Sequence, residues 1–250
     1  MCWSGEASAV LATVGVGSTV YAACKGEDRR LWMPLGYFSL MEVLQAYTYT
    51  VIDDCASPAN QIATLLGYLH IVFQPFLANL ISLYFIPRPV REAIEPWVYA
   101  VVSVGAVCML VSVYPFAWAQ TCQPGVEIFC GQRICSVSGE WHIAWEINRT
   151  VVALGVIPYV LSTFALPVLY GSWRMTLYHA LSGPGLAWLT TGSLNEMAAV
   201  WCLYSIGLLL IVAKTPLRSL LHVRHWPLYA WFTAPALPLD AAAGERAGAR

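Results

Sequence analysis

Long apolar stretches alternate with short polar stretches along most of the chain. A membrane-spanning helix needs about 20 mostly apolar residues, because the hydrocarbon layer is about 30 Å thick. Seven stretches approach or exceed this length. They are Ala7–Cys24, Leu31–Ile52, Ile62–Ile86, Trp97–Ala119, Trp141–Tyr170, Met175–Thr190 and Leu194–Ala213. The pattern predicts an all-α, polytopic transmembrane bundle of about seven helices.

Two of these stretches are irregular. Trp141–Tyr170 is longer than one span requires, whereas Met175–Thr190 is short and contains the sequence Gly183-Pro184-Gly185. Proline and glycine bend or interrupt membrane helices. We therefore expect these two stretches to form a kinked pair or to include a re-entrant segment.

Basic residues are distributed unevenly between the loops. Of the 13 lysines and arginines, only Arg133 and Arg149 fall on the side that follows the fourth stretch. The others lie on the opposite side: Lys25, Arg29, Arg30, Arg88, Arg91, Arg174, Lys214, Arg218, Arg224, Arg246 and Arg250. Because loops rich in Lys and Arg remain cytoplasmic, this asymmetry predicts the N-terminus outside and the C-terminus inside.

The pattern divides the chain into two parts. Residues 1–213 are predicted to form the seven-helix transmembrane domain. Between Leu217 and Trp226, apolar residues alternate with basic ones, which is typical of a helix lying at a membrane surface. Small and polar residues follow in Ala241–Arg250. Residues 214–250 are therefore expected to form a cytoplasmic amphipathic segment and a disordered tail.

Composition supports a multi-pass protein whose main partner is the lipid bilayer. The chain is 58% hydrophobic and 11% charged, whereas soluble domains are about 25% charged. Its formal net charge is −1, so no basic field is available to attract nucleic acid.

Most cysteines fall on the predicted outer side, where oxidising conditions favour disulfides. The loop between the fourth and fifth stretches holds Cys122, Cys130 and Cys135, together with several glycines. Their spacing lacks the paired Cys-x-x-Cys of a zinc ribbon. We predict that Cys122 pairs with Cys130 or Cys135, because a short bridge would close a loop that cannot pack alone.

Polar side chains interrupt the apolar stretches, where a charge costs several kcal/mol and usually marks a functional site. Glu42, Gln45 and Tyr49 share one face of the second predicted helix, because residues three or four apart are neighbours on a helix. Titratable groups from four stretches are expected to converge on the outer half of the bundle. These groups are Glu42, His70, His142, Glu146 and Glu196. His179 lies instead in the predicted inner half.

This set is consistent with a transition-metal site, because imidazole and carboxylate ligands from facing helices bind Zn, Mn or Fe. The predicted metal ligands are His70, His142, Glu42 and Glu146, surrounded by hydrogen-bonding groups on Gln45, Gln74 and Asn79. A metal with an open coordination position would activate water. The predicted catalytic residues are Glu42, Glu146 and Glu196, in a membrane enzyme that acts on a lipid or small molecule.

Three other interpretations remain open. The polar groups could be structural, with Glu196 and Asn195 capping the last helix and His70 and Gln74 bonding across helices. Glu42 and Glu196 could instead serve a small-molecule or proton-coupled transporter or channel. In the third interpretation, a sensory or assembly protein binds a partner through its outer cysteine-rich loop. A retinal cofactor is not expected, because the last stretch contains no lysine.

Several short sequences resemble a family of multi-spanning bacterial and viral membrane proteins of unknown function. They are the opening Met1-Cys2-Trp3-Ser4, Met41-Glu42, Tyr68-Leu69-His70-Ile71 and Glu140-Trp141-His142-Ile143-Ala144-Trp145. The resemblance covers most of the chain. It implies a shared fold but assigns no role to any residue. The apolar stretches predict a multi-pass protein of the cell membrane, the inner membrane in a bacterium.

Overall fold

The computed structural model describes residues 3–150 and 152–233 and is mostly helical. Within these residues, four helices are long and apolar enough to cross a membrane. They are α1 (Gly5–Cys24), α3 (Pro58–Tyr84), α4 (Arg88–Val111) and α9 (Met197–Lys214). Cys2 and the predicted disordered tail, Ala241–Arg250, lie outside the described residues.

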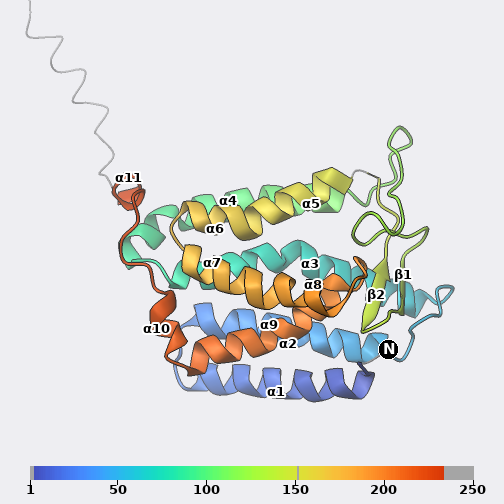
Figure 1. The fold of residues 1–250 in the computed structure, drawn as a ribbon, viewed down its shortest axis with the longest axis horizontal. Coiled ribbons are helices and arrows are strands. Elements are labelled where there is room, and N and C mark those ends of the chain that lie inside the picture. Colours follow the sequence, from blue (N-terminus) through green and yellow to red (C-terminus); the bar gives the residue numbers. More distant parts are fainter. Residues whose placement is uncertain (1–2, 151, 234–250) are drawn as a thin grey trace, which may run out of the picture.

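Further helical segments run alongside these four (Figure 1). One is continuous, α2 (Arg29–Thr48), and two contain a π-helical turn, which we label η1 and η2. The first of the two comprises α5 (Val152–Val160), η1 (Leu161–Ala165) and α6 (Leu166–Leu169). The second comprises α7 (Trp173–Ala180), η2 (Leu181–Gly185) and α8 (Leu186–Thr190). The Gly183-Pro184-Gly185 sequence thus ends a π-helical turn, and the backbone continues as helix beyond it.

Side-chain caps fix where three of the helices begin. The Ser4 hydroxyl accepts a hydrogen bond from Ala7 N at 3.2 Å, and the Asp28 carboxylate accepts one from Arg30 N at 2.8 Å. Ser57 caps α3 in the same way and is followed by Pro58, whose fixed φ suits the first turn of a helix. Such caps satisfy backbone N–H groups that have no partner within the helix.

Trp141–Tyr170 does not form one continuous helix, so that prediction is wrong in its first part. Ile143–Glu146 form strand β2, which pairs antiparallel with β1 (Cys135–Ser138), and the helix starts only at Val152. Apolar content alone misled the prediction, because Ile143 and Trp145 are buried in this hairpin region. The fourth predicted stretch also extends too far, since α4 ends at Val111 and the chain turns before Pro115.

The hairpin and the start of α1 lie at one end of the bundle, which we call the hairpin end (Figure 1). Both disulfides involve the loop that carries the hairpin. Asn60 at the start of α3 holds Ser136 of β1 through two hydrogen bonds of 2.8 and 2.9 Å. Asn195 holds Cys130 through two hydrogen bonds of 3.0 Å. The loop between α4 and α5 is therefore fastened to helices far from it in sequence.

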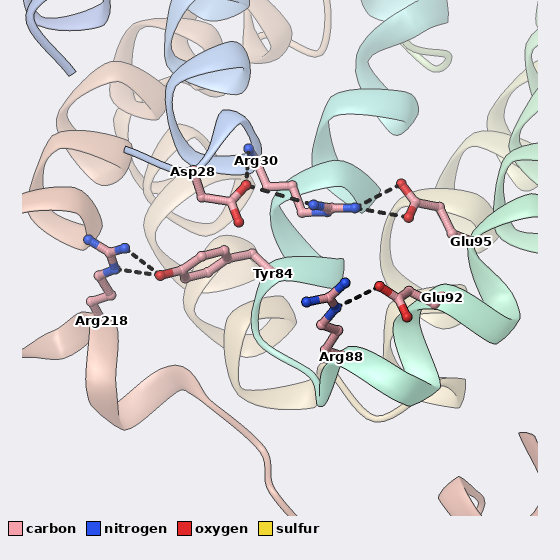
Figure 2. A network of polar contacts seen from close by, with 7 residues as sticks. All are labelled: Asp28, Arg30, Tyr84, Arg88, Glu92, Glu95 and Arg218. Atoms are coloured by element: carbon pink, nitrogen blue, oxygen red, sulfur yellow. Dashed lines mark hydrogen bonds and ion pairs between the residues drawn. The ribbon is translucent and has the colours of Figure 1, made fainter. Parts of the chain in front are cut away.

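The opposite end carries α10 (Leu217–Leu221) and α11 (Tyr229–Thr233), and we call it the α10 end (Figure 1). Figure 2 shows a charged network there, in which Arg30 of α2 binds Glu95 of α4 at 2.9 and 3.2 Å. Arg218 of α10 donates to the Tyr84 hydroxyl at 2.9 Å and pairs with Glu27 at 3.0 Å. These pairs connect segments separated by up to 191 residues in sequence.

Candidate functional site

Glu42 is a fully buried carboxylate in the middle of the helical bundle. It lies on α2, which packs against α1, α3 and α9, and its exposed fraction is 0%. Neither carboxylate oxygen has a hydrogen-bond partner within residues 3–150 and 152–233. Both amide atoms of Gln45, one helical turn nearer the hairpin end, also lack a partner there. Leaving one buried polar group without a hydrogen bond costs about 1–3 kcal/mol, and such groups are rare in native proteins. Two of them one helical turn apart therefore indicate a functional role.

Small and hydroxyl residues line the contact between α1 and α2 on both sides of Glu42. Ser8 of α1 lies beside Glu42 without a hydrogen bond of normal geometry. Toward the α10 end, Gly15 of α1 packs directly on Ser39 of α2. One turn further, Thr19 packs on Gly36 in the same manner. We call this contact the α1–α2 seam, and it places hydroxyl groups above and below a buried carboxylate.

His142 closes the seam at the hairpin end. Its Nδ1 lies 2.7 Å from the Tyr49 hydroxyl, and the two rings stack at 5.7 Å. Its Nε2 has no partner among the described residues. Burial lowers the pKa of His142 to about 3, because the charged imidazolium would lose its hydration. At neutral pH this imidazole is therefore uncharged.

His70 lies on α3 and contacts different residues from those that contact His142. Its ring stacks on Tyr37 with centroids 3.8 Å apart, and the Tyr37 hydroxyl donates to the backbone carbonyl of His70. One turn further along α3, the Gln74 carbonyl accepts a hydrogen bond of 3.0 Å from Tyr159. The Nε2 atoms of both His70 and Gln74 have no partner within the described ranges.

Asn79 has a structural role. Its amide group donates to the carbonyls of Pro75 and Ser162, each at 2.8 Å, and its carbonyl accepts from the Tyr170 hydroxyl at 3.0 Å. Ser162 lies in η1, where the π-helical turn alters the regular hydrogen-bond ladder. Asn79 therefore joins α3 to η1 and α6, and these contacts use its side chain fully.

Glu196 anchors the hairpin. Its carboxylate accepts backbone hydrogen bonds from Glu140, from Trp141 at 3.0 Å and from His142 at 3.3 Å. It also accepts one from the Thr191 hydroxyl at 3.1 Å. Charged hydrogen bonds of this kind each contribute about 1.5–3 kcal/mol. Both oxygens are engaged, which favours the structural interpretation of Glu196. The carboxylate holds the hairpin, however, and makes no capping hydrogen bond to α9, so the expected cap is not formed by this side chain.

Glu146 lies away from Glu42. It belongs to β2, packs against Gly131 and faces a surface hollow lined by Pro124 and Arg133. It cannot share a helical face with His142 as expected, because both residues lie in or beside a strand.

The four predicted metal ligands are not assembled into one centre. Among the described residues, a single group of three or more metal-ligating side chains has its ligand atoms within 4.8 Å: Cys122, Glu127 and Cys130. Two of these are joined to each other in a disulfide, so their sulfurs are not free to bind a metal. The metal hypothesis thus has no geometric support in this part of the chain.

The loop contains two disulfides. Cys122 pairs with Cys130, which is one of the two partners predicted for it, and Cys135 pairs with Cys55. The second bridge joins residues 80 apart in sequence and was not predicted. Cys24, Cys108 and Cys202 are free thiols within the described ranges.

Two groups of residues were missed from the sequence. Asn60 was not singled out, and Asn195 was expected only as a helix cap, but both hold the loop that carries the hairpin. Arg149, counted from the sequence only among the basic residues on the outer side, is buried and lines an internal cavity beside Tyr159. A buried arginine has no distinctive sequence pattern, because its burial depends on how the loop folds over the bundle.

Four helices long and apolar enough to cross a membrane, with buried polar groups between helices, are typical of a helical membrane protein. Residues 6–222 match the family of unknown function DUF5765, and the chain therefore belongs to this family. No curated protein and no solved structure matches it. The resemblance to a family without an assigned function is thus confirmed, and the function must be argued from the site.

Proposed function

We propose that the chain crosses the membrane seven times, with the hairpin end outside and the α10 end inside. The four long apolar helices account for four spans, and α2 and the two interrupted helices account for three more. The distribution of charge supports this orientation, since the network of Arg30, Arg218 and neighbouring acids lies at the α10 end. The disulfides lie at the hairpin end, where an oxidising compartment would maintain them.

Reporter fusions test this topology. A reporter active only outside the cell should be active when fused at Gly125 and inactive at Glu27. A reporter that folds only in the cytoplasm should give the opposite result at the same two positions. Activity in the reversed compartments would contradict the orientation, and equal activity at both positions would contradict a defined topology.

We propose further that the protein translocates protons across the membrane through Glu42, as a channel or carrier. The observation that carries the proposal is the isolated Glu42 carboxylate, which is fully buried and has no hydrogen-bond partner in the described structure. A protonated carboxyl group is neutral and can donate a hydrogen bond, so it tolerates a low-dielectric site better than an unpaired carboxylate does. Glu42 is therefore suited to hold a proton between the two sides.

The α1–α2 seam supplies groups that can pass the proton to and from Glu42. On the hairpin side, Ser8 lies beside Glu42, and the Tyr49–His142 pair follows the end of α2, which is about 9 Å from Glu42 along the helix. On the other side, Ser39 and Thr19 extend toward the α10 end. Hydroxyl groups both donate and accept hydrogen bonds, as a proton relay requires.

Proton flux into liposomes tests the proposal. The purified parent protein is reconstituted into liposomes that contain a pH-sensitive dye. The outside solution is made more acidic than the inside, and valinomycin with K⁺ compensates the charge that the protons carry. We expect the parent to acidify the interior at least about tenfold faster than protein-free liposomes, a difference that would correspond to a barrier lowered by about 1.4 kcal/mol. Glu42→Gln should return the rate to that of protein-free liposomes, because the amide cannot carry the proton.

Glu6→Gln is the matched control, since Glu6 is an exposed glutamate on α1. This variant should keep the parent rate. Glu42→Leu tests whether Glu42 has only a packing role. If Glu42 only packs the bundle, this variant should keep the parent flux, whereas a proton-carrying Glu42 requires that the flux be lost. Absence of flux in the folded parent, or equal flux in the parent and Glu42→Gln, would refute proton translocation.

A further inference from the structure

A second internal site is lined by residues outside α1 and α2. It is a cavity of about 180 Å³ enclosed by α3, α4, α5, η1, η2, α9 and the loop before α5. Its walls are almost entirely apolar, and Phe129, Tyr159, Phe164 and Trp201 give it an aromatic character. A cavity of about 150 Å³ with apolar walls admits benzene, so this one admits a single ring with a short chain.

The cavity reaches the side of the bundle that faces lipid in the proposed topology. Val160 lines the cavity and is nevertheless 47% exposed, so the wall there is a single side chain thick. Both π-helical turns contribute to the lining, η1 through Phe164 and η2 through Pro184. π-Helical turns occur most often at functional sites, because they displace side chains from the regular helical positions.

One charged side chain lines this otherwise apolar space. Arg149 is 1% exposed and donates a hydrogen bond of 3.0 Å to the Ile128 carbonyl. Tyr68 and Glu127 lie within electrostatic range of its guanidinium group. A guanidinium group is planar and presents several N–H donors, a geometry that matches a carboxylate.

We propose that this cavity binds a small amphipathic carboxylate, whose apolar body fills the aromatic chamber and whose carboxylate faces Arg149. The combination of one cation with apolar walls excludes polar metabolites, because their hydroxyl groups would be left without partners. The same chemistry occurs in a free aromatic acid and in a medium-chain fatty acid. The site is independent of Glu42 and does not require proton translocation.

Binding of 3-phenylpropanoate to the parent protein in nanodiscs tests the proposal, with 3-phenylpropanol and 3-phenylpropylamine as probes of the same shape. Empty nanodiscs correct for partitioning into lipid. We expect the carboxylate to bind at least about tenfold more tightly than the alcohol, with the amine weakest, because only the carboxylate pairs with the guanidinium. Competition by octanoate then distinguishes the sources: stronger binding of octanoate indicates a fatty acid, and weaker binding indicates an aromatic acid.

Neighbouring positions on α5 provide a matched pair of variants. Val156 lines the cavity, whereas Ile157 does not belong to its lining and is 56% exposed. Val156→Phe should weaken 3-phenylpropanoate binding at least about tenfold, because the ring occupies the space, and Ile157→Phe should leave binding unchanged. Arg149→Gln should reduce the affinity for the acid to that for the alcohol.

Arg149 also holds the loop through Ile128, so Arg149→Gln could unfold the loop. In that case, the comparison of Val156→Phe with Ile157→Phe tests the binding proposal by itself. Glu42→Gln should bind 3-phenylpropanoate like the parent, which separates this site from the proton path. Equal affinity of the parent for the acid, the alcohol and the amine would overturn the proposal. An equal loss in Val156→Phe and Ile157→Phe would do the same.

Discussion

Replacing Cys55 and Cys135 together with serine should destabilise the protein by about 4 kcal/mol, the larger of the two disulfide effects. The bridge joins residues 80 apart in sequence, and closing a loop of that size removes about 4.5 kcal/mol of chain entropy from the unfolded state. Membrane insertion already restricts an unfolded helical protein, which makes this figure an upper value. The measurement is the free energy of unfolding by denaturant in mixed micelles.

The bridge between Cys122 and Cys130 provides the internal comparison. Cys122 and Cys130 are only 8 residues apart, so the corresponding double serine variant should lose about 2.5 kcal/mol. Each variant removes one bridge from the loop between α4 and α5, but the closed chain is 80 residues long in one case and 8 in the other. A smaller loss for the Cys55 and Cys135 variant than for the Cys122 and Cys130 variant would contradict the entropic explanation. Mass spectrometry of the parent, purified without reductant, should first show both bridges formed.

The sequence located the helices well because their signal is local. A run of about 20 apolar residues indicates a helix without knowledge of its neighbours. The hairpin was misread because an apolar run has the same composition in a buried strand and in a membrane helix. Only the pairing of β1 with β2, a tertiary fact, decides between them.

Long-range contacts account for most of what was missed at the site. The spacing of Glu42, Gln45 and Tyr49 predicted their common helical face, because that face depends only on helical geometry. Which residues lie opposite that face depends on how the chain returns. His142 reaches Tyr49 across 93 residues, and Glu196 reaches the hairpin across more than 50.

Acid should loosen the hairpin end through His142. Burial lowers the pKa of this imidazole to about 3 in the folded protein, whereas an unfolded histidine has a pKa of about 6.5. A group whose folded pKa is lower than its unfolded pKa binds more protons when unfolded, so stability falls as the pH drops below about 6.5. The slope approaches about 1.4 kcal/mol for each pH unit and ends near pH 3, which amounts to roughly 4–5 kcal/mol.

Unfolding free energies of the parent and of His142→Gln, measured between pH 7.5 and pH 4, test this expectation. His142→Gln should be less stable than the parent at neutral pH, because it loses the stacked ring beside Tyr49, but its profile should be flatter below pH 6.5. His225→Gln, which changes an exposed histidine, should follow the parent profile. Parallel profiles for the parent and His142→Gln would mean that His142 takes up protons without unfolding the hairpin, and the acid response would then have to arise elsewhere.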